Sequence, residues 1–202
     1  MESYPRERHL RQVLVNLWRS RKPIIRLQNT FFHDATERRI QRPKDPEAQQ
    51  AHYSGKKKQH TVKNNLMINT DSKVVLLTPC YEGRIHDKHI ADMTVSFLPR
   101  RSYLYQDSGF QGFSVPGVKM IQPTKKPKGR ELTVQEKAKN RKISSIRIRI
   151  EHAMSGIKRY RIVKDKLRNY KKGFTDLVME TCSGLHNFRL NFRPWEYPTP
   201  CE

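Results

Sequence analysis

Acidic residues are scarce in this 202-residue chain, and cysteines are scarcer still. Only 19 Asp and Glu face 41 Lys and Arg, which leaves a formal net charge of +22 at pH 7. The three cysteines, Cys80, Cys182 and Cys201, are too few and too scattered for a disulfide framework or a Cys-based zinc site. No apolar run approaches the roughly 18 residues of a membrane-spanning helix, and residues 1–5 lack the apolar core of a secretory signal. We therefore expect a cytoplasmic protein with no membrane partner.

The surplus of basic residues most often marks a polyanionic partner, and nucleic acid is the commonest one. Lys and Arg occur along the whole chain and alternate with apolar segments. A disordered basic tail would instead be one block with few large apolar residues. The composition favours a folded nucleic-acid-binding domain with one or more basic faces, and it implies no reaction.

Hydrophobic periodicity predicts the elements of this domain. In chain order, we expect a basic amphipathic helix at 9–19, strands at 24–32, 62–69 and 73–78, a short helix at 87–97, strands at 103–105 and 118–121, and helices at 131–162 and 174–190. The polar segment 42–55, with two prolines, is expected to be a loop. Mixed strands followed by helices predict an α/β domain with a mostly contiguous sheet.

The segment 131–162 is the most informative. A capping box, Thr133-x-x-Glu136, precedes a helical pattern. Residues 146–150 alternate as a strand would, but the wider window favours a helix because its apolar residues fall within an arc of about 100°. The arc consists of Ile143, Ile146, Ile150, Ala153, Met154 and Ile157.

Four polar residues flank this arc on one stripe of about 40°: Asn140, Arg147, Glu151 and Lys158. On the helix alone, the pair Arg147 and Glu151 is more simply a surface ion pair at i,i+4 spacing, contributing about 0.2–0.5 kcal/mol. A catalytic interpretation of Glu151 requires further carboxylates to converge on it.

Two further carboxylates are available. Asp34 follows one expected strand and Asp107 follows another. Each alone is more often a turn or cap residue. In an α/β sheet, however, acidic residues at the carboxyl ends of adjacent strands point into one crevice. Two such Asp and a helical Glu form a candidate site in a chain with so few acids.

Five segments in order, 34–43, 53–63, 83–88, 106–112 and 140–158, carry a family resemblance. They contain the first acidic motif, a basic strand, a Gly83-x-x-His86-Asp87 motif, the second acidic motif, and a final block from Asn140 to Lys158. The chain resembles the DDE transposases of bacterial insertion sequences, in the branch related to Harbinger-type elements. The resemblance covers about residues 24–192.

The resemblance implies an RNase H-like fold, with a mixed sheet flanked by helices, and catalytic and metal-binding roles for Asp34, Asp107 and Glu151. The implied cofactor is Mg²⁺, with Mn²⁺ as a substitute, as two ions that activate the nucleophile and stabilise the leaving oxygen. The implied DNA-binding residues are Lys56, Lys57, Lys58, Arg147 and Lys158. His86, Asp87 and Asn140 are candidates for supporting positions around the metal.

Two of these assignments have simpler alternatives. His86 and Asp87 could mark a helix start, where an acid is favoured by the helix dipole. Lys56, Lys57 and Lys58 could be a solvated strand edge. Zinc bound by His86, Asp87 and His89 is disfavoured because nothing distant completes a ligand set.

The expected domains are a basic helical segment at 1–23, a catalytic domain at 24–192 and a tail at 193–202. The family usually has a longer helix-turn-helix region before the first Asp, so we expect 1–23 to be its remnant in a truncated or partial copy. The expected function is metal-dependent DNA cleavage and strand transfer in transposition, by a dimer or higher oligomer on double-stranded DNA at the nucleoid. The alternatives are an inactive remnant that binds DNA non-specifically, and a basic nucleic-acid-binding protein of another class.

Overall fold

The computed structural model describes residues 29–95, 98–169 and 171–197. A central sheet runs in the order β2 (Tyr53–Ser54), β3 (Gln59–Ile68), β1 (Thr30–Arg39), β6 (Ser102–Gln106) and β7 (Val118–Ile121), and β4 (Val74–Leu77) and β5 (Tyr81–Glu82) also pair with β3. The β1–β3 and β3–β4 pairs are antiparallel, and the β1–β6 and β6–β7 pairs are parallel. This mixed sheet confirms the expected α/β, RNase H-like fold.

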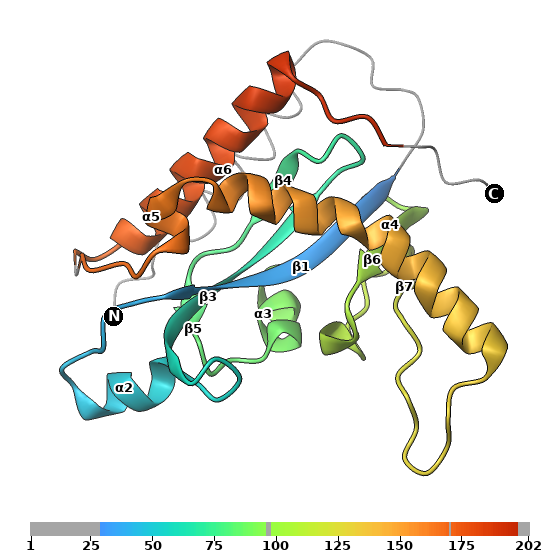
Figure 1. The fold of residues 1–202 in the computed structure, drawn as a ribbon, viewed down its shortest axis with the longest axis horizontal. Helices are drawn as coiled ribbons and strands as arrows, with labels where there is room; N and C mark the ends of the chain where they lie inside the picture. Colours follow the sequence, from blue (N-terminus) through green and yellow to red (C-terminus); the bar gives the residue numbers. More distant parts are fainter. Residues whose placement is uncertain (1–28, 96–97, 170, 198–202) are drawn as a thin grey trace.

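Helices cover both faces of the sheet. The long helix α4 (Val134–Lys158) crosses one face beside α5 (Arg161–Lys164) and α6 (Phe174–Phe192), as Figure 1 shows. The short helix α3 (Asp87–Thr94) and the 3-10 turn η1 (Ser108–Phe110) cover the opposite face. Among the described helices, none combines the length and apolar character needed to cross a bilayer.

Alternation along the strands builds two cores. Leu66 and Ile68 of β3 pack toward α4 and α6, whereas Met67 between them packs toward α3. The expected apolar arc of α4 is confirmed, since Ile150, Ala153 and Ile157 are fully buried against the sheet. The capping box at the start of α4 is also present.

Close packing between α4 and α6 depends on Gly156. A Cβ atom at this position would lie 2.7 Å from Nδ1 of the buried His186 in α6. The His186 Nε2 atom lies 3.0 Å from the carbonyl oxygen of Ser72, in the turn between β3 and β4. Glycine at residue 156 therefore reflects a close approach between helices.

Two local predictions are wrong. The expected loop 42–55 contains the helix α2 (Pro46–His52) and the strand β2. Asp45 caps α2 by accepting from the backbone N–H of Ala48, and Pro46 occupies the first turn, where a missing N–H costs nothing. The strand expected at 24–32 instead continues to Arg39, so Asp34 lies within β1 rather than after it.

The helix expected at 9–19, and with it the segment 1–23, lies outside the described residues. The domain limits stay a prediction. Within the expected tail, Trp195 packs against His186 and Arg189 of α6, and Tyr197 stacks on His152 of α4.

Candidate active site

The register between β1 and β6 brings Asp34 and Asp107 together. Their parallel pairing ends at His33 and Gln106, and the next residues are Asp34, within β1, and Asp107, directly after β6. Both carboxylates reach the same guanidinium of Arg147 from α4 above the sheet. The predicted convergence of two strand carboxylates therefore holds, although β1 continues past Asp34 along β3.

Beneath these carboxylates lies a buried polar pair. His33 is fully buried, its Nδ1 lies 2.8 Å from Nε2 of Gln106, and its ring contacts that of Phe110. Burial lowers the pKa of His33 to about 3, so the ring is neutral at physiological pH. A neutral ring in a fixed orientation supports the strand ends that carry Asp34 and Asp107.

Asp34 is the more enclosed of the two carboxylates. Its side chain is 23% exposed, against 50% for Asp107. Burial raises the pKa of Asp34 to about 6, assisted by the nearby charges of Asp107 and Asp87 and opposed by the Ala35 N–H and by Arg147. Its charged form needs a cation nearby.

Arg147 supplies that cation. Its Nη2 lies 3.4 Å from Oδ2 of Asp34, and its Nη1 lies 3.4 Å from Oδ1 of Asp107. The Arg147 side chain is only 11% exposed. The sequence indicated a DNA-contacting role for this residue. The sequence did not indicate that Arg147 links Asp34 and Asp107, because a stripe of residues on α4 does not show which strands lie beneath that helix.

Glu151 is not brought to the two Asp. It is exposed on α4, one turn after Arg147, and its carboxylate makes no ion pair with a described residue. In the described part of the chain, no three Asp, Glu, His or Cys side chains come close enough to hold a metal ion. The structure thus assembles two of the three expected acids.

Asp87 approaches from the other face of the sheet. It is the first residue of α3, with His86 at the N-cap position, so the expected helix start is present. Its Oδ1 lies 3.1 Å from Nζ of Lys63 on β3. Gly83 allows the preceding segment to lie against β3, because a Cβ there would lie 2.1 Å from Oγ1 of Thr61.

The remaining predicted residues lie in two places. Asn140 contacts the loop after β7, donating to the carbonyl oxygen of Thr124 at 2.9 Å and accepting from its N–H at 2.8 Å. This double hydrogen bond fixes the loop to α4. Lys56, Lys57 and Lys58 lie in the exposed turn between β2 and β3.

Lys158, the last residue of α4, interacts electrostatically with Asp34. Burial lowers the pKa of Lys158, repulsion from Lys57 adds to this, and attraction to Asp34 opposes it. Two residues of the predicted stripe, Arg147 and Lys158, are therefore attracted to Asp34.

The donor atoms suit a hard divalent cation. Carboxylate oxygens are the ligands that Mg²⁺ prefers. The enclosed Asp34 requires positive charge, and Arg147 provides it where two carboxylates converge. Asp34 and Asp107 thus fit such an ion, and Glu151 is the nearest further acid on α4.

An RNase H-like sheet with two adjacent strand acids beneath a helix that carries a third is the architecture of a nuclease-type domain. The family model described as DDE superfamily endonuclease matches residues 33–187, more than half of the chain. The chain belongs to this family, which confirms the resemblance inferred from its motifs.

One relative is "Probable transposase for insertion sequence element IS702" from Microchaete diplosiphon, 30% identical over 163 residues. The aligned part covers 81% of this chain and 58% of that relative, so the chain spans little more than half of the relative's length. No solved structure matches the chain.

Proposed function

We propose that this chain is the catalytic domain of an insertion-sequence transposase that cleaves DNA strands and joins them to target DNA. Asp34, Asp107 and Glu151 are its catalytic acids. The observation that carries the proposal is the convergence of Asp34 and Asp107 beneath α4, the helix on which Glu151 lies.

These acids would hold Mg²⁺ or Mn²⁺, as two ions. Bound there, such ions make water or a DNA 3′-hydroxyl nucleophilic near neutral pH and stabilise the leaving oxygen. The protein itself orients the carboxylates that would hold these ions. The Ala35 N–H fixes one oxygen of Asp34, and the buried His33 supports the strand end from below. Lys158 would contact the phosphate next to the scissile bond.

The proposed partners are the two ends of the mobile element and a target duplex. Because two ends must be joined in one event, the working form is a dimer or a higher oligomer on DNA. The net charge of +22 supports a sequence-independent grip on both duplexes.

A specific observation favours one alternative, a DNA-binding remnant without catalysis. Glu151 is exposed and apart from the two Asp, while Arg147 lies between them. A chain fixed in this arrangement would bind DNA and cut none.

The deciding experiment uses purified protein, Mn²⁺ and duplex DNA carrying the element's ends. We expect the parent to cleave, and Asp34→Asn and Glu151→Gln to lose cleavage while keeping DNA affinity. Glu180→Gln, an exposed acid on α6, is the matched control and retains cleavage. A parent that never cuts, or variants that cut as the parent does, would support the remnant. Salt dependence of binding cannot separate the two, because both bind phosphates.

A further inference from the structure

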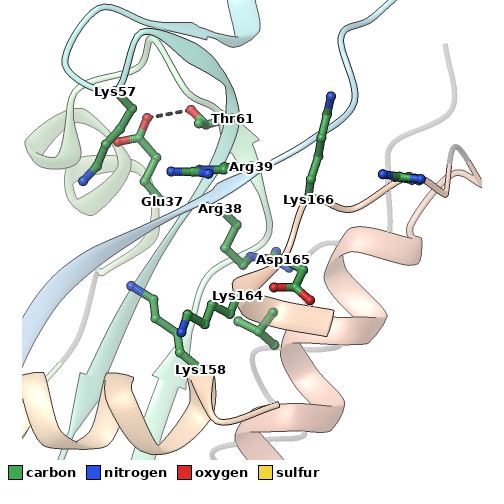
Figure 2. Close-up of a pocket in the computed structure, with 11 residues that line it drawn as sticks. Glu37, Arg38, Arg39, Lys57, Thr61, Lys158, Lys164, Asp165 and Lys166 are labelled. Carbon is green, nitrogen blue, oxygen red and sulfur yellow. Dashed lines mark hydrogen bonds between the residues drawn. The ribbon is translucent and has the colours of Figure 1, made fainter. Parts of the chain in front are cut away.

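A cavity of about 760 Å³ opens along β1, and its lining includes Glu37, three residues after Asp34 on the same strand. Figure 2 shows side chains entering it from several elements: Lys57 from the turn between β2 and β3, Arg39 from β1, Lys158 from the end of α4, and Lys166 from the segment after α5. Elements distant in sequence thus converge here.

The cavity is lined mainly by cations. Arg39, Lys57, Lys158, Lys164, Lys166 and Arg168 line it, and none of them forms an ion pair with a described residue. Two acids also line the cavity, and only Asp165 pairs with a cation, Arg161, which lies outside the lining. Glu37 accepts from Oγ1 of Thr61 at 2.6 Å, and Asp165 pairs with Arg161 at 3.1 Å. The cavity therefore presents an excess of positive charge.

The backbone after α5 places these cations. Leu167 is buried and pairs with the end of β1, donating to the carbonyl oxygen of Arg39 at 3.0 Å and accepting from the N–H of Gln41 at 3.0 Å. Its neighbours Lys166 and Arg168 stay exposed. The buried Leu167 thus fixes the positions of the two cations beside it in the sequence.

The strand β1 and Lys158 relate this cavity to Asp34, since Glu37 in the lining follows Asp34 on β1. Lys158 lines the cavity and is attracted by the charge of Asp34. Lys57, on another wall, repels it. Crowded cations without acidic partners are stabilised by a bound anion.

We propose that this cavity binds the sugar–phosphate backbone of a single DNA strand as it leaves the candidate active site, and that it contacts the phosphates only. Its volume lies within the range of about 300–1,000 Å³ typical of small-ligand pockets, which suits a short stretch of one strand. None of the described residues that line it is aromatic, so the described lining offers the bases no stacking platform. The direction of the strand rests on the proposed function, whereas phosphate binding does not.

The test is fluorescence anisotropy of the full chain with a labelled single-stranded oligonucleotide and an abasic oligonucleotide of equal length. The double variant Lys166→Ala/Arg168→Ala should bind both about tenfold more weakly at 0.1 M salt. The slope of log affinity against log salt should become less steep by about 1.4, or 0.7 for each lost phosphate contact. The abasic strand should bind the parent as tightly as the complete one.

Two variants make this result specific. Lys57→Ala, on another wall, should reproduce about half of the loss. Arg141→Ala/Lys142→Ala removes two exposed cations from α4 outside the cavity and should have little effect. An equal loss in that control pair, or a much weaker abasic strand, overturns the proposal.

The outcome is independent of catalysis. Loss of strand binding in a chain that never cleaves DNA leaves the cavity assigned and the transposase proposal refuted. If the parent cleaves DNA and the cavity variants bind the single strand normally, the transposase proposal stands and the cavity proposal is refuted.

Discussion

Arg147 lies with its Nη2 atom 3.4 Å from Oδ2 of Asp34, an enclosed carboxylate whose ordinary ionised form needs a cation. The same guanidinium reaches Asp107. If Asp34 and Asp107 held a divalent ion, Arg147 would compete with it for their carboxylate oxygens.

The first prediction concerns this competition. Arg147→Met should tighten Mn²⁺ binding by roughly five- to tenfold, because the ion no longer has to break ion pairs contributing about 1 kcal/mol. Isothermal titration calorimetry with metal-free protein measures the change. Arg141→Met, the same substitution at an exposed position on α4, should leave affinity unchanged. Unchanged or weaker binding by Arg147→Met contradicts competition.

The second prediction concerns the pH dependence of stability through Asp34. Its pKa is raised from 3.8 to about 6, so the unfolded chain loses this proton first and ionisation destabilises the fold. The contribution of Asp34 to the free energy of unfolding therefore falls as pH rises from 3.8 to 6. At 1.36 kcal/mol per pKa unit, the total loss is about 3 kcal/mol. Relative to the parent, Asp34→Asn should gain that amount between pH 4 and pH 8 in urea unfolding with EDTA. A difference that stays constant with pH refutes the cause.

His33, the preceding residue, should show the opposite slope. Its pKa is lowered from 6.5 to about 3, so the unfolded chain binds a proton that the fold excludes. Stability is complete above pH 6.5 and falls as pH drops toward 3. His33→Leu removes this penalty and should gain about 3 kcal/mol relative to the parent between pH 7 and pH 4. Urea unfolding at the two pH values tests it, and an unchanged difference would mean that the ring is accessible to protons.

A fourth prediction separates two roles of Asn140. Because its side chain makes two hydrogen bonds to the backbone of Thr124, Asn140→Ala should cost about 1–2 kcal/mol and speed hydrogen exchange near that residue. Metal affinity should not change. Lys139→Ala, an exposed neighbour, serves as the control. A loss of metal affinity without a loss of stability would instead support a role around the metal.

Local patterns were sufficient to predict much of the fold. The capping box at Thr133 and the apolar arc up to Ile157 defined α4 within a few residues, because that helix buries one continuous face. The hairpin of β3 and β4 was predicted from its turn. The helix α2 was not predicted because a polar segment with two prolines indicates a loop, although proline is well tolerated in the first turn of a helix.

Long-range contacts were the part that the sequence could not supply. Motif spacing indicated Asp34, Asp107 and Glu151, but only the register of β1 and β6 shows that the first two meet. The charge of Arg147 and the family resemblance predicted contact with DNA. Its carboxylate partners lie 113 and 40 residues away in the sequence, so no local pattern indicates them. The cavity cations after α5 lie within a basic run that offers no local sign of convergence.

Gly156 has no side chain, yet it determines how closely the helix that carries Glu151 and Lys158 packs against α6. It sits between Glu151 and Lys158 on α4, at the point where that helix nearly touches His186. A side chain there would meet the His186 ring, so α4 and α6 would have to move apart, and α4 carries both Glu151 and Lys158. The position of α4, and of the charged residues on it, therefore depends on the absence of a Cβ atom at residue 156.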